Sequence, residues 1–191
     1  MNDPLQGLGG SAYLQAVHGK KTGTPPRCDL ETARTLHTTL LGLIQSGLVK
    51  SAHDCSEGGL AVCLAESCIS QLVARETPRL IGAQIDLSLV GRESSRAQKF
   101  EGEEKSGLDR VSPHRLDSLL FGETQSRIVV TCNPLDAVKV VERAKLMGVP
   151  AARIGTVGGD KLTIKTAVGD FSAPSAELHD AWWNSIARAM A

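Results

Sequence analysis

The sequence has few aromatic residues, no long apolar run and no excess of charge of either sign. Aromatic residues make up 3% of the 191 residues, which leaves few side chains on which bases or sugars could stack. The 21 basic and 21 acidic residues cancel to a net charge of zero, whereas binding to nucleic acid or to anionic membranes requires a basic surplus. No apolar run approaches the roughly 18 residues of a membrane span. We therefore expect neither nucleic acid nor membrane as a partner.

The cysteines lack the spacing of a disulfide framework or a metal site. Their number, five, is odd, and no Cys-x-x-Cys pair occurs. Cys63 and Cys68 are five residues apart in a predicted helix, which turns them away from each other. The five histidines show no ligand spacing either. Because the N-terminus also lacks a basic-then-apolar signal segment, we expect a reducing, cytoplasmic location in which the cysteines act as small apolar residues.

The overall composition of the sequence is typical of a globular protein. It is 41% apolar and 22% charged, and its length allows one domain with a real core. Apolar periodicity predicts helices over about 30–46, 60–68, 116–121 and 133–148, and a last helix from about 174 whose apolar stripe docks on the core. Strands are predicted near 49–54, 80–87, 128–132, 153–157 and 161–166, the last two forming a hairpin around a turn at 158–160. The order favours an α+β fold, a mixed β-sheet flanked by helices.

Three segments follow from composition. Residues 1–28 are rich in Gly and Pro and are predicted to be an extended lead-in from a preceding domain. Residues 29–191 then form the α+β domain. Within it, residues 91–112 are charged and small and are predicted to be a mobile surface loop, with a lid over a ligand as the alternative.

A first candidate motif lies between the strand at 49–54 and the following helix. Asp54 and Glu57 flank a turn that ends in Gly58-Gly59. Such a turn can bring backbone N–H groups and a helix N-terminus to an anion, and the carboxylates could hold a divalent cation. The alternative is a tight structural turn with Ser56 as the helix cap.

A second polar cluster precedes the strand at 128–132. It consists of Glu123, Thr124, Gln125, Ser126 and Arg127. Glu and Gln can hold hydroxyls or amides, and Arg127 can form a forked contact with a phosphate. Capping and a surface ion pair are the structural alternative. His53 is similarly open to two interpretations, a proton carrier beside Asp54 or a structural residue.

Together these segments resemble one family, the C-terminal domain of phosphoribosylformylglycinamidine synthase, which is of the aminoimidazole ribonucleotide synthetase-like type. The resemblance rests on four stretches that occur in the family's order, namely residues 8–14, 47–62, 119–127 and 154–160. It implies the last part of an ATP-dependent ligase of purine biosynthesis, which converts formylglycinamide ribonucleotide and glutamine-derived ammonia to the amidine.

The resemblance also implies cofactors and partners. The full enzyme uses ATP and Mg²⁺, and its partners are the preceding domains, a glutaminase subunit or domain, and in some members a small accessory subunit. Its catalytic residues lie in parts absent from this sequence. We therefore expect no catalytic residue here and no ligase activity from this chain alone.

In this resemblance the two clusters border an auxiliary site rather than the reaction centre. It places Asp54, Ser56, Gly58 and Gly59 at a phosphate or nucleotide, with Asp54 also holding the metal. The opposite side is lined by Glu123, Thr124, Gln125 and Arg127. Thr124 stands where the family typically has Ser, and Cys55 where it has an aliphatic residue. The domain is then a scaffold with an auxiliary or vestigial pocket.

Two alternatives remain open. One is a domain of another enzyme of the same superfamily, of the selenophosphate synthetase or thiamine-phosphate kinase type. The other is a subunit-interaction module that binds no ligand.

Overall fold

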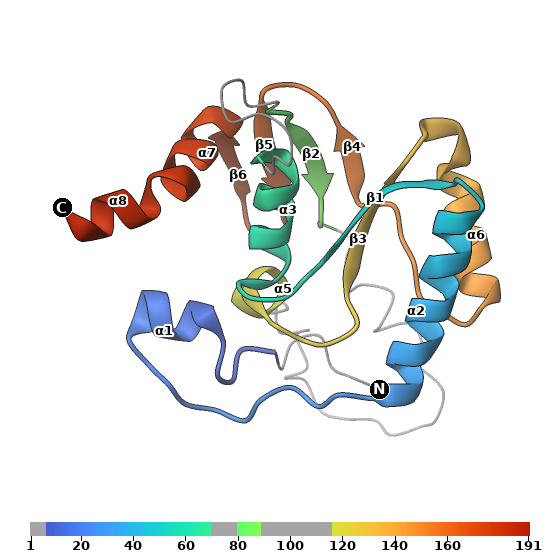
Figure 1. Ribbon diagram of the computed structural model, residues 1–191, viewed down its shortest axis with the longest axis horizontal. Helices are drawn as coiled ribbons and strands as arrows, with labels where there is room; N and C mark the ends of the chain where they lie inside the picture. The colour runs from blue at the N-terminus through green and yellow to red at the C-terminus, as the bar shows by residue number, and fades with distance from the viewer. Residues whose placement is uncertain (1–6, 70–79, 89–115) are drawn as a thin grey trace, which may run out of the picture. The chain divides into compact units, whose positions relative to one another are not determined.

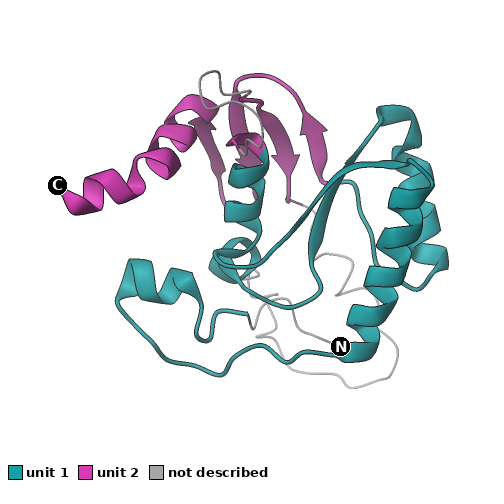
Figure 2. Ribbon diagram, in the orientation of Figure 1, with its two compact units in different colours: residues 1–67, 117–153 teal, residues 68–116, 154–191 magenta. Residues whose placement is uncertain are grey.

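A computed structural model describes residues 7–69, 80–88 and 116–191. The described residues fall into two compact units, one within residues 1–67 and 117–153 and the other within residues 68–116 and 154–191 (Figure 2). The loop predicted at 91–112 lies outside the described residues. Within the described part, no helix is long and apolar enough to cross a membrane.

The first unit is mainly helical and contains a two-stranded antiparallel sheet (Figure 1). Its elements are α1 (Ala12–His18), α2 (Leu30–Gln45), β1 (Val49–Asp54), α3 (Gly59–Ile69), α5 (Leu116–Phe121), β3 (Ile128–Cys132), the short 3₁₀ helix η1 (Pro134–Asp136) and α6 (Ala137–Leu146). The last two residues of α3 and the first of α5 are assigned to the second unit.

Helix α2 and strand β1 lie where the sequence predicts them. The Asp29 carboxylate accepts hydrogen bonds from the N–H groups of Glu31 and Thr32 at 3.0 and 3.3 Å, and so caps the first turn. Gly47 ends the helix with a φ of +72°. Strand β1 then pairs with β3, with Asp54 opposite Ile128. Because the pair is antiparallel, the loop after β1 and the loop before β3 meet at the same end of the sheet.

The lead-in is not wholly extended, contrary to the prediction for residues 1–28. It contains α1, whose N–H of Leu14 is capped by the Ser11 hydroxyl at 3.3 Å. Tyr13 on this helix stacks on Phe121 with ring centroids 4.5 Å apart. Leu8 is also buried. The short apolar stretch around Leu8 and Tyr13 therefore packs against the first unit.

The helix predicted from Asn133 is present, but only part of its expected apolar face is buried. Pro134 begins a 3₁₀ turn and the α-helix starts only at Ala137. Val140 and Ala144 are buried, whereas Leu135 is 91% and Val138 72% exposed. Of the apolar stripe expected at Leu135, Val138, Val141 and Ala144, only Ala144 is fully buried, because the 3₁₀ turn at the start changes the rotation of the chain at Leu135 and Val138.

The second unit holds a four-stranded mixed sheet, which confirms the predicted α+β class. Strand β2 (Ala83–Asp86) runs parallel to β5 (Lys161–Lys165) and antiparallel to β4 (Gly155–Val157). Strand β6 (Asp170–Pro174), which was not predicted, pairs antiparallel with β5. The strand order is β4-β2-β5-β6. Alternate residues of β2 and β5 are buried, among them Ile85, Leu162 and Ile164.

The predicted hairpin between residues 153 and 166 is wrong, because β2 lies between its two strands. The turn at Gly158-Gly159 bonds to Gly82 instead. Gly158 N–H donates to Gly82 O, and Gly82 N–H donates to Gly159 O, both at 2.8 Å. A side chain at Gly82 would meet Lys161 O at 2.4 Å. Glycine at position 82 therefore allows the chain that leads into β2 to lie directly against the turn at residues 158–159.

The C-terminal apolar stripe does not dock on the described core, contrary to expectation. The last helix is divided into α7 (Ser175–Trp183) and α8 (Ser185–Met190). Trp182 is 46% exposed, Ile186 72% and Met190 82%. The start of α7 is nevertheless fixed to the sheet of its unit, since the buried Ser175 hydroxyl donates to Ile81 O at 3.1 Å.

Candidate functional site

The two polar clusters meet in the first unit. The N–H of Cys55 donates to Arg127 O at 2.9 Å, which joins the loop after β1 to the loop before β3. Between these loops lies a cavity of about 340 Å³. It is lined by His37, Asp54, Cys55, Ser56, Glu57, Glu123, Thr124, Gln125, Ser126, Arg127 and Ile128.

Six of the eight predicted site residues line this cavity, and the glycine pair does not. The prediction of bare N–H groups at the pair is wrong. Gly58 N–H donates to Glu123 Oε1 at 2.8 Å, and Gly59 N–H donates to Ser56 O at 3.0 Å. A Cβ at Gly59 would meet Gly122 O at 2.7 Å. The close approach that glycine permits here is between two protein segments.

Glu123 is held by backbone donors. Its Oε1 atom also accepts a hydrogen bond from Ala12 N–H, at 2.9 Å. One carboxylate oxygen therefore joins the start of α1 to the turn before α3. The acidic side chain satisfies backbone groups that would otherwise lack partners near two helix starts.

Arg127 is also engaged by backbone. Its Nη1 donates to Gly122 O and its Nη2 to Leu119 O, each at 3.1 Å. These carbonyls belong to the C-terminal end of α5, where a cation is favoured. The fork predicted to bind a phosphate thus binds two carbonyls, although the guanidinium still contributes positive charge to the cavity.

Thr124 differs from Glu123 and Arg127 because its hydroxyl group has no hydrogen-bond partner. The residue is only 5% exposed, and its Oγ1 atom is buried without a hydrogen bond. A Cβ built on Gly7 would lie 2.9 Å from the Thr124 methyl group, so the methyl faces Gly7. A buried hydroxyl without a partner costs about 1–3 kcal/mol.

The turn that follows Thr124 has an unusual backbone. Ser126 adopts a φ of +64° and is the one non-glycine residue of the described segments with a positive φ. Such a conformation is unfavourable for an L residue. Gln125 before it is exposed at the cavity. The strained turn presents the Gln125 amide to solvent while Thr124 stays buried.

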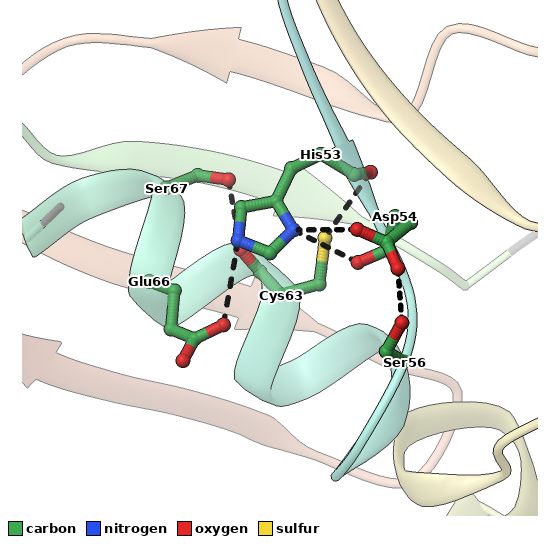
Figure 3. Close-up of polar contacts among 6 residues, drawn as sticks. All are labelled: His53, Asp54, Ser56, Cys63, Glu66 and Ser67. Atoms are coloured by element: carbon green, nitrogen blue, oxygen red, sulfur yellow. Dashed lines mark hydrogen bonds and ion pairs between the residues drawn. The ribbon is translucent and has the colours of Figure 1, made fainter.

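On the opposite side, Asp54 is an exposed carboxylate in a local network of polar contacts (Figure 3). The Ser56 hydroxyl donates to Asp54 Oδ2. This bond, followed by the backbone N–H of Asp54 and the nearby His53, lowers the pKa of Asp54 below its ordinary 3.8. Asp54 is therefore ionised across the neutral range and well into acid.

His53 has a structural position. Its Nδ1 donates to Asp54 O at 2.8 Å, and its Nε2 lies 3.3 Å from Glu66 Oε2 on α3 (Figure 3). It does not line the cavity. The structural interpretation of His53 is therefore the better one.

Cys55 lines the cavity and is buried. The nearby Cys63 lowers the pKa of Cys55 to about 7, and the charges of Arg127 and His53 act in the same direction. The interaction with Cys55 and burial raise the pKa of Cys63. Sequence reasoning left His37 and Ile128 out of the site because no motif marks them, and it noted Cys55 and Ser126 within the two motifs without making them site residues.

The cavity carries more negative than positive charge. Asp54, Glu57 and Glu123 face a single permanent cation, Arg127. The described residues contain no group of three His, Cys, Asp or Glu side chains placed to hold a metal ion. A cation here would take Asp54 as its protein ligand and fill its remaining positions with water and ligand oxygens, as Mg²⁺ commonly does.

Comparison with known proteins decides the family. Residues 2–166 match the family described as AIR synthase related protein, C-terminal domain. The chain belongs to this family. It is 40% identical over 185 residues to the phosphoribosylformylglycinamidine synthase subunit PurL of Anaeromyxobacter dehalogenans, and 33% identical over 192 residues to that of Moorella thermoacetica. These alignments cover 95% and 100% of the chain but only 21% and 22% of the relatives.

Solved structures confirm the fold. Thermotoga maritima PurL complexed with FGAR matches with a TM-score of 0.56 and 21% identity, covering 80% of this chain and 21% of that one. The PurLQS structure from the same organism matches with a TM-score of 0.54 and 19% identity, over 90% of this chain and 25% of that one. The chain therefore spans about a fifth to a quarter of the proteins that it resembles.

Proposed function

We propose that the cavity between the two loops binds the phosphate groups of a nucleotide as their magnesium complex. The observation that carries this proposal is the buried, unpartnered hydroxyl of Thr124 in the cavity lining. A phosphate oxygen would accept the hydrogen bond that this hydroxyl lacks. The volume of about 340 Å³ is within the range of small-molecule sites.

The charges of the cavity explain why the metal is needed. With three carboxylates against one guanidinium, a free phosphate would meet net repulsion. A divalent cation reverses that sign, and Asp54 is the carboxylate best placed to hold it, because it is exposed at the cavity and ionised well into acid. Nucleotide and metal would thus bind together.

The remaining residues divide into two groups. Gln125 is exposed at the cavity and can donate to a ligand, whereas Ser56, also exposed there, donates its hydroxyl proton to Asp54. Gly58, Gly59, Glu123 and Arg127 instead form the framework, because their polar groups already bond to other groups of the chain. No residue of this chain is assigned a catalytic role.

A thermal-shift experiment tests the site with a matched control. ADP, ATP and inorganic phosphate are added to the chain with and without Mg²⁺; saturation at 100 times Kd adds about 2.7 kcal/mol of stability. We expect a shift only with nucleotide and Mg²⁺, reduced in Thr124→Val. Thr39→Val is the control, since Thr39 Oγ1 is also buried and unpartnered but lies outside the cavity lining. Absence of any shift in the wild type would refute the proposal.

For the longer protein to which this domain corresponds, we propose the ligase activity of phosphoribosylformylglycinamidine synthase. Such an enzyme uses ATP to convert formylglycinamide ribonucleotide and ammonia from a glutaminase partner to formylglycinamidine ribonucleotide, in the cytoplasm. Support comes from the 40% identity over 95% of the chain. The similarity to the PurLQS structure supports association with further subunits.

The isolated chain should have no ligase activity. We expect no amidine product from the chain with ATP, Mg²⁺, substrate and ammonium, and product when the longer protein is assayed. Turnover by the chain alone would contradict the proposal. The same assay run with selenide or thiamine phosphate tests the other chemistries of the superfamily.

A subunit-interaction role is a second candidate. The exposed apolar side chains of α7 and α8, including Trp182 and Ile186, favour it. The subunit-interaction role would explain the chain better if neither nucleotide nor phosphate raised the melting temperature of the chain.

A further inference from the structure

The cavity is lined by residues from two places in the first unit. Ten of the eleven lining residues lie at 54–57 and 123–128, around the end of the β1–β3 pair. The eleventh, His37, belongs to helix α2. The two loops include Thr124 and Asp54, which the proposed function assigns to phosphate and metal. His37 is therefore the lining residue that can meet the rest of a bound nucleotide.

The His37 side chain is available to a ligand. Its helix is fixed elsewhere, since Thr39 and Leu43 are the buried residues of α2, whereas His37 is exposed. Within the part of the chain that the structure describes, the His37 imidazole makes no hydrogen bond, ion pair or ring contact. The helix thus holds an unpaired ring at the wall of the cavity.

This ring has a shape that the other lining groups lack. Of the described residues that line the cavity, His37 is the only one with an aromatic ring. The planar guanidinium of Arg127 is held by the carbonyls of Gly122 and Leu119. A nucleotide base presents a flat π-face, which stacks on aromatic side chains, histidine included. Carboxylates and hydroxyls, which dominate the two loops, offer no such face.

We propose that the base of the bound nucleotide stacks on the imidazole of His37, while its phosphate groups lie between the two loops. This inference rests on the proposed function and adds the nucleoside end of the ligand to it. The site would then select nucleoside phosphates over pyrophosphate. A contact between a His37 ring nitrogen and a phosphate is the competing explanation, and it needs an N–H group rather than the face of the ring.

Isothermal titration calorimetry in Mg²⁺ separates the two explanations, with ADP and pyrophosphate as ligands. His37→Ala should bind ADP about fivefold more weakly or worse, the fold-change of one base stacked on a side chain. His37→Phe keeps a flat ring without a ring nitrogen and should bind ADP like the wild type. Leu41→Ala is the matched control, because Leu41 is exposed on the same helix but lies outside the lining. Pyrophosphate should not distinguish the four proteins.

Proton NMR of the wild-type chain gives a direct readout. The ring current of a stacked adenine should shift the ring protons of His37 when ADP is added, and pyrophosphate should leave them in place. The His37 signals are identified among those of the five histidines by their absence from His37→Phe.

The proposal is overturned if His37→Ala binds ADP as tightly as the wild type, or if ADP leaves the His37 ring protons unshifted. It is equally overturned if His37→Phe loses as much affinity as His37→Ala, or if His37→Ala weakens pyrophosphate as much as ADP. Absence of ADP binding to the wild type would refute the proposed function, and this inference with it, so the two failures are distinguishable.

Discussion

Glu123 and Thr124 are neighbours in sequence, but their side chains differ in whether they have hydrogen-bond partners. One oxygen of Glu123 accepts from Ala12 and Gly58, at 2.9 and 2.8 Å, whereas the buried Thr124 hydroxyl has no partner. The first residue is part of the framework, and the second is the residue that we propose contacts a ligand. This distinction determines what substitutions at the two positions should do.

Replacing Glu123 should mainly change stability. Glu123→Ala leaves the N–H groups of Ala12 and Gly58 without their acceptor, so we expect a loss of about 2 kcal/mol in the free energy of unfolding. Glu123→Gln keeps an acceptor oxygen and should lose less. Urea denaturation measures both, with Glu142→Ala on the exposed side of α6 as a control expected to change little. Equal stability of the Ala variant and the wild type would contradict this role.

The acidity of Asp54 should depend on Ser56. The Ser56 hydroxyl is the largest cause of the lowered pKa of Asp54. Because the folded pKa is below the unfolded one, the stabilising contribution is present above the unfolded pKa. It is lost as the pH falls through the folded pKa.

In Ser56→Ala the pKa of Asp54 should therefore rise toward 3.8. A carbon-13 NMR titration of the Asp54 carboxyl group measures the midpoint in both proteins. Ser67→Ala is the control, because Ser67 bonds to Cys63 O and not to Asp54. An unchanged midpoint in Ser56→Ala would show that the hydroxyl does not stabilise the carboxylate.

At the scale of elements, the site depends on how closely α3 approaches the end of α5. A Cβ at Gly59 would lie 2.7–2.9 Å from backbone atoms of Leu120, Phe121 and Gly122. Backbone atoms cannot move aside as the end of a flexible side chain can. The glycine therefore sets the distance between the two elements whose loops border the cavity.

Alanine substitutions separate this steric effect from backbone strain. Gly148→Ala should cost about 1 kcal/mol, because Gly148 has a φ of +81° but nothing within 4 Å of an added Cβ. Gly59→Ala has a similar φ of +66° together with the backbone clash, and we expect about 3 kcal/mol or more. Chemical denaturation compares the two. Equal losses would mean that α3 can move away from α5 without cost.

The elements show which sequence signals suffice. Helix α2 was predictable because Asp29, the apolar repeat and Gly47 are all local. The hairpin at 158–160 was mispredicted because the partner of β4 is β2, more than 60 residues away along the chain. A local turn signal cannot reveal a strand inserted between its two arms.

The site, too, could be predicted from sequence only in part. The sequence predicted that the loops after Asp54 and before Ile128 carry the polar residues, and the antiparallel pairing brings them together. It could not predict that Arg127 and Glu123 bond to backbone, because those carbonyl and N–H groups are unsatisfied only in the folded chain. His37 entered the lining from α2 without any motif.

For the molecule as a whole, the domain corresponds to about a fifth of its relatives, and no residue in it is assigned a catalytic role. Its proposed contribution is a magnesium-dependent nucleotide site in the first unit. Exposed apolar residues on α7 and α8 suit a domain that works within a larger enzyme.

The measurement that tests the central claim most directly is isothermal titration calorimetry of the chain with ADP in Mg²⁺ and in EDTA. We predict binding in Mg²⁺, none in EDTA, none in Asp54→Asn, and an affinity about tenfold weaker in Thr124→Val, the equivalent of one hydrogen bond. Asp136→Asn, outside the cavity, should bind like the wild type. No binding in the wild type, or equal binding in EDTA, would contradict the account.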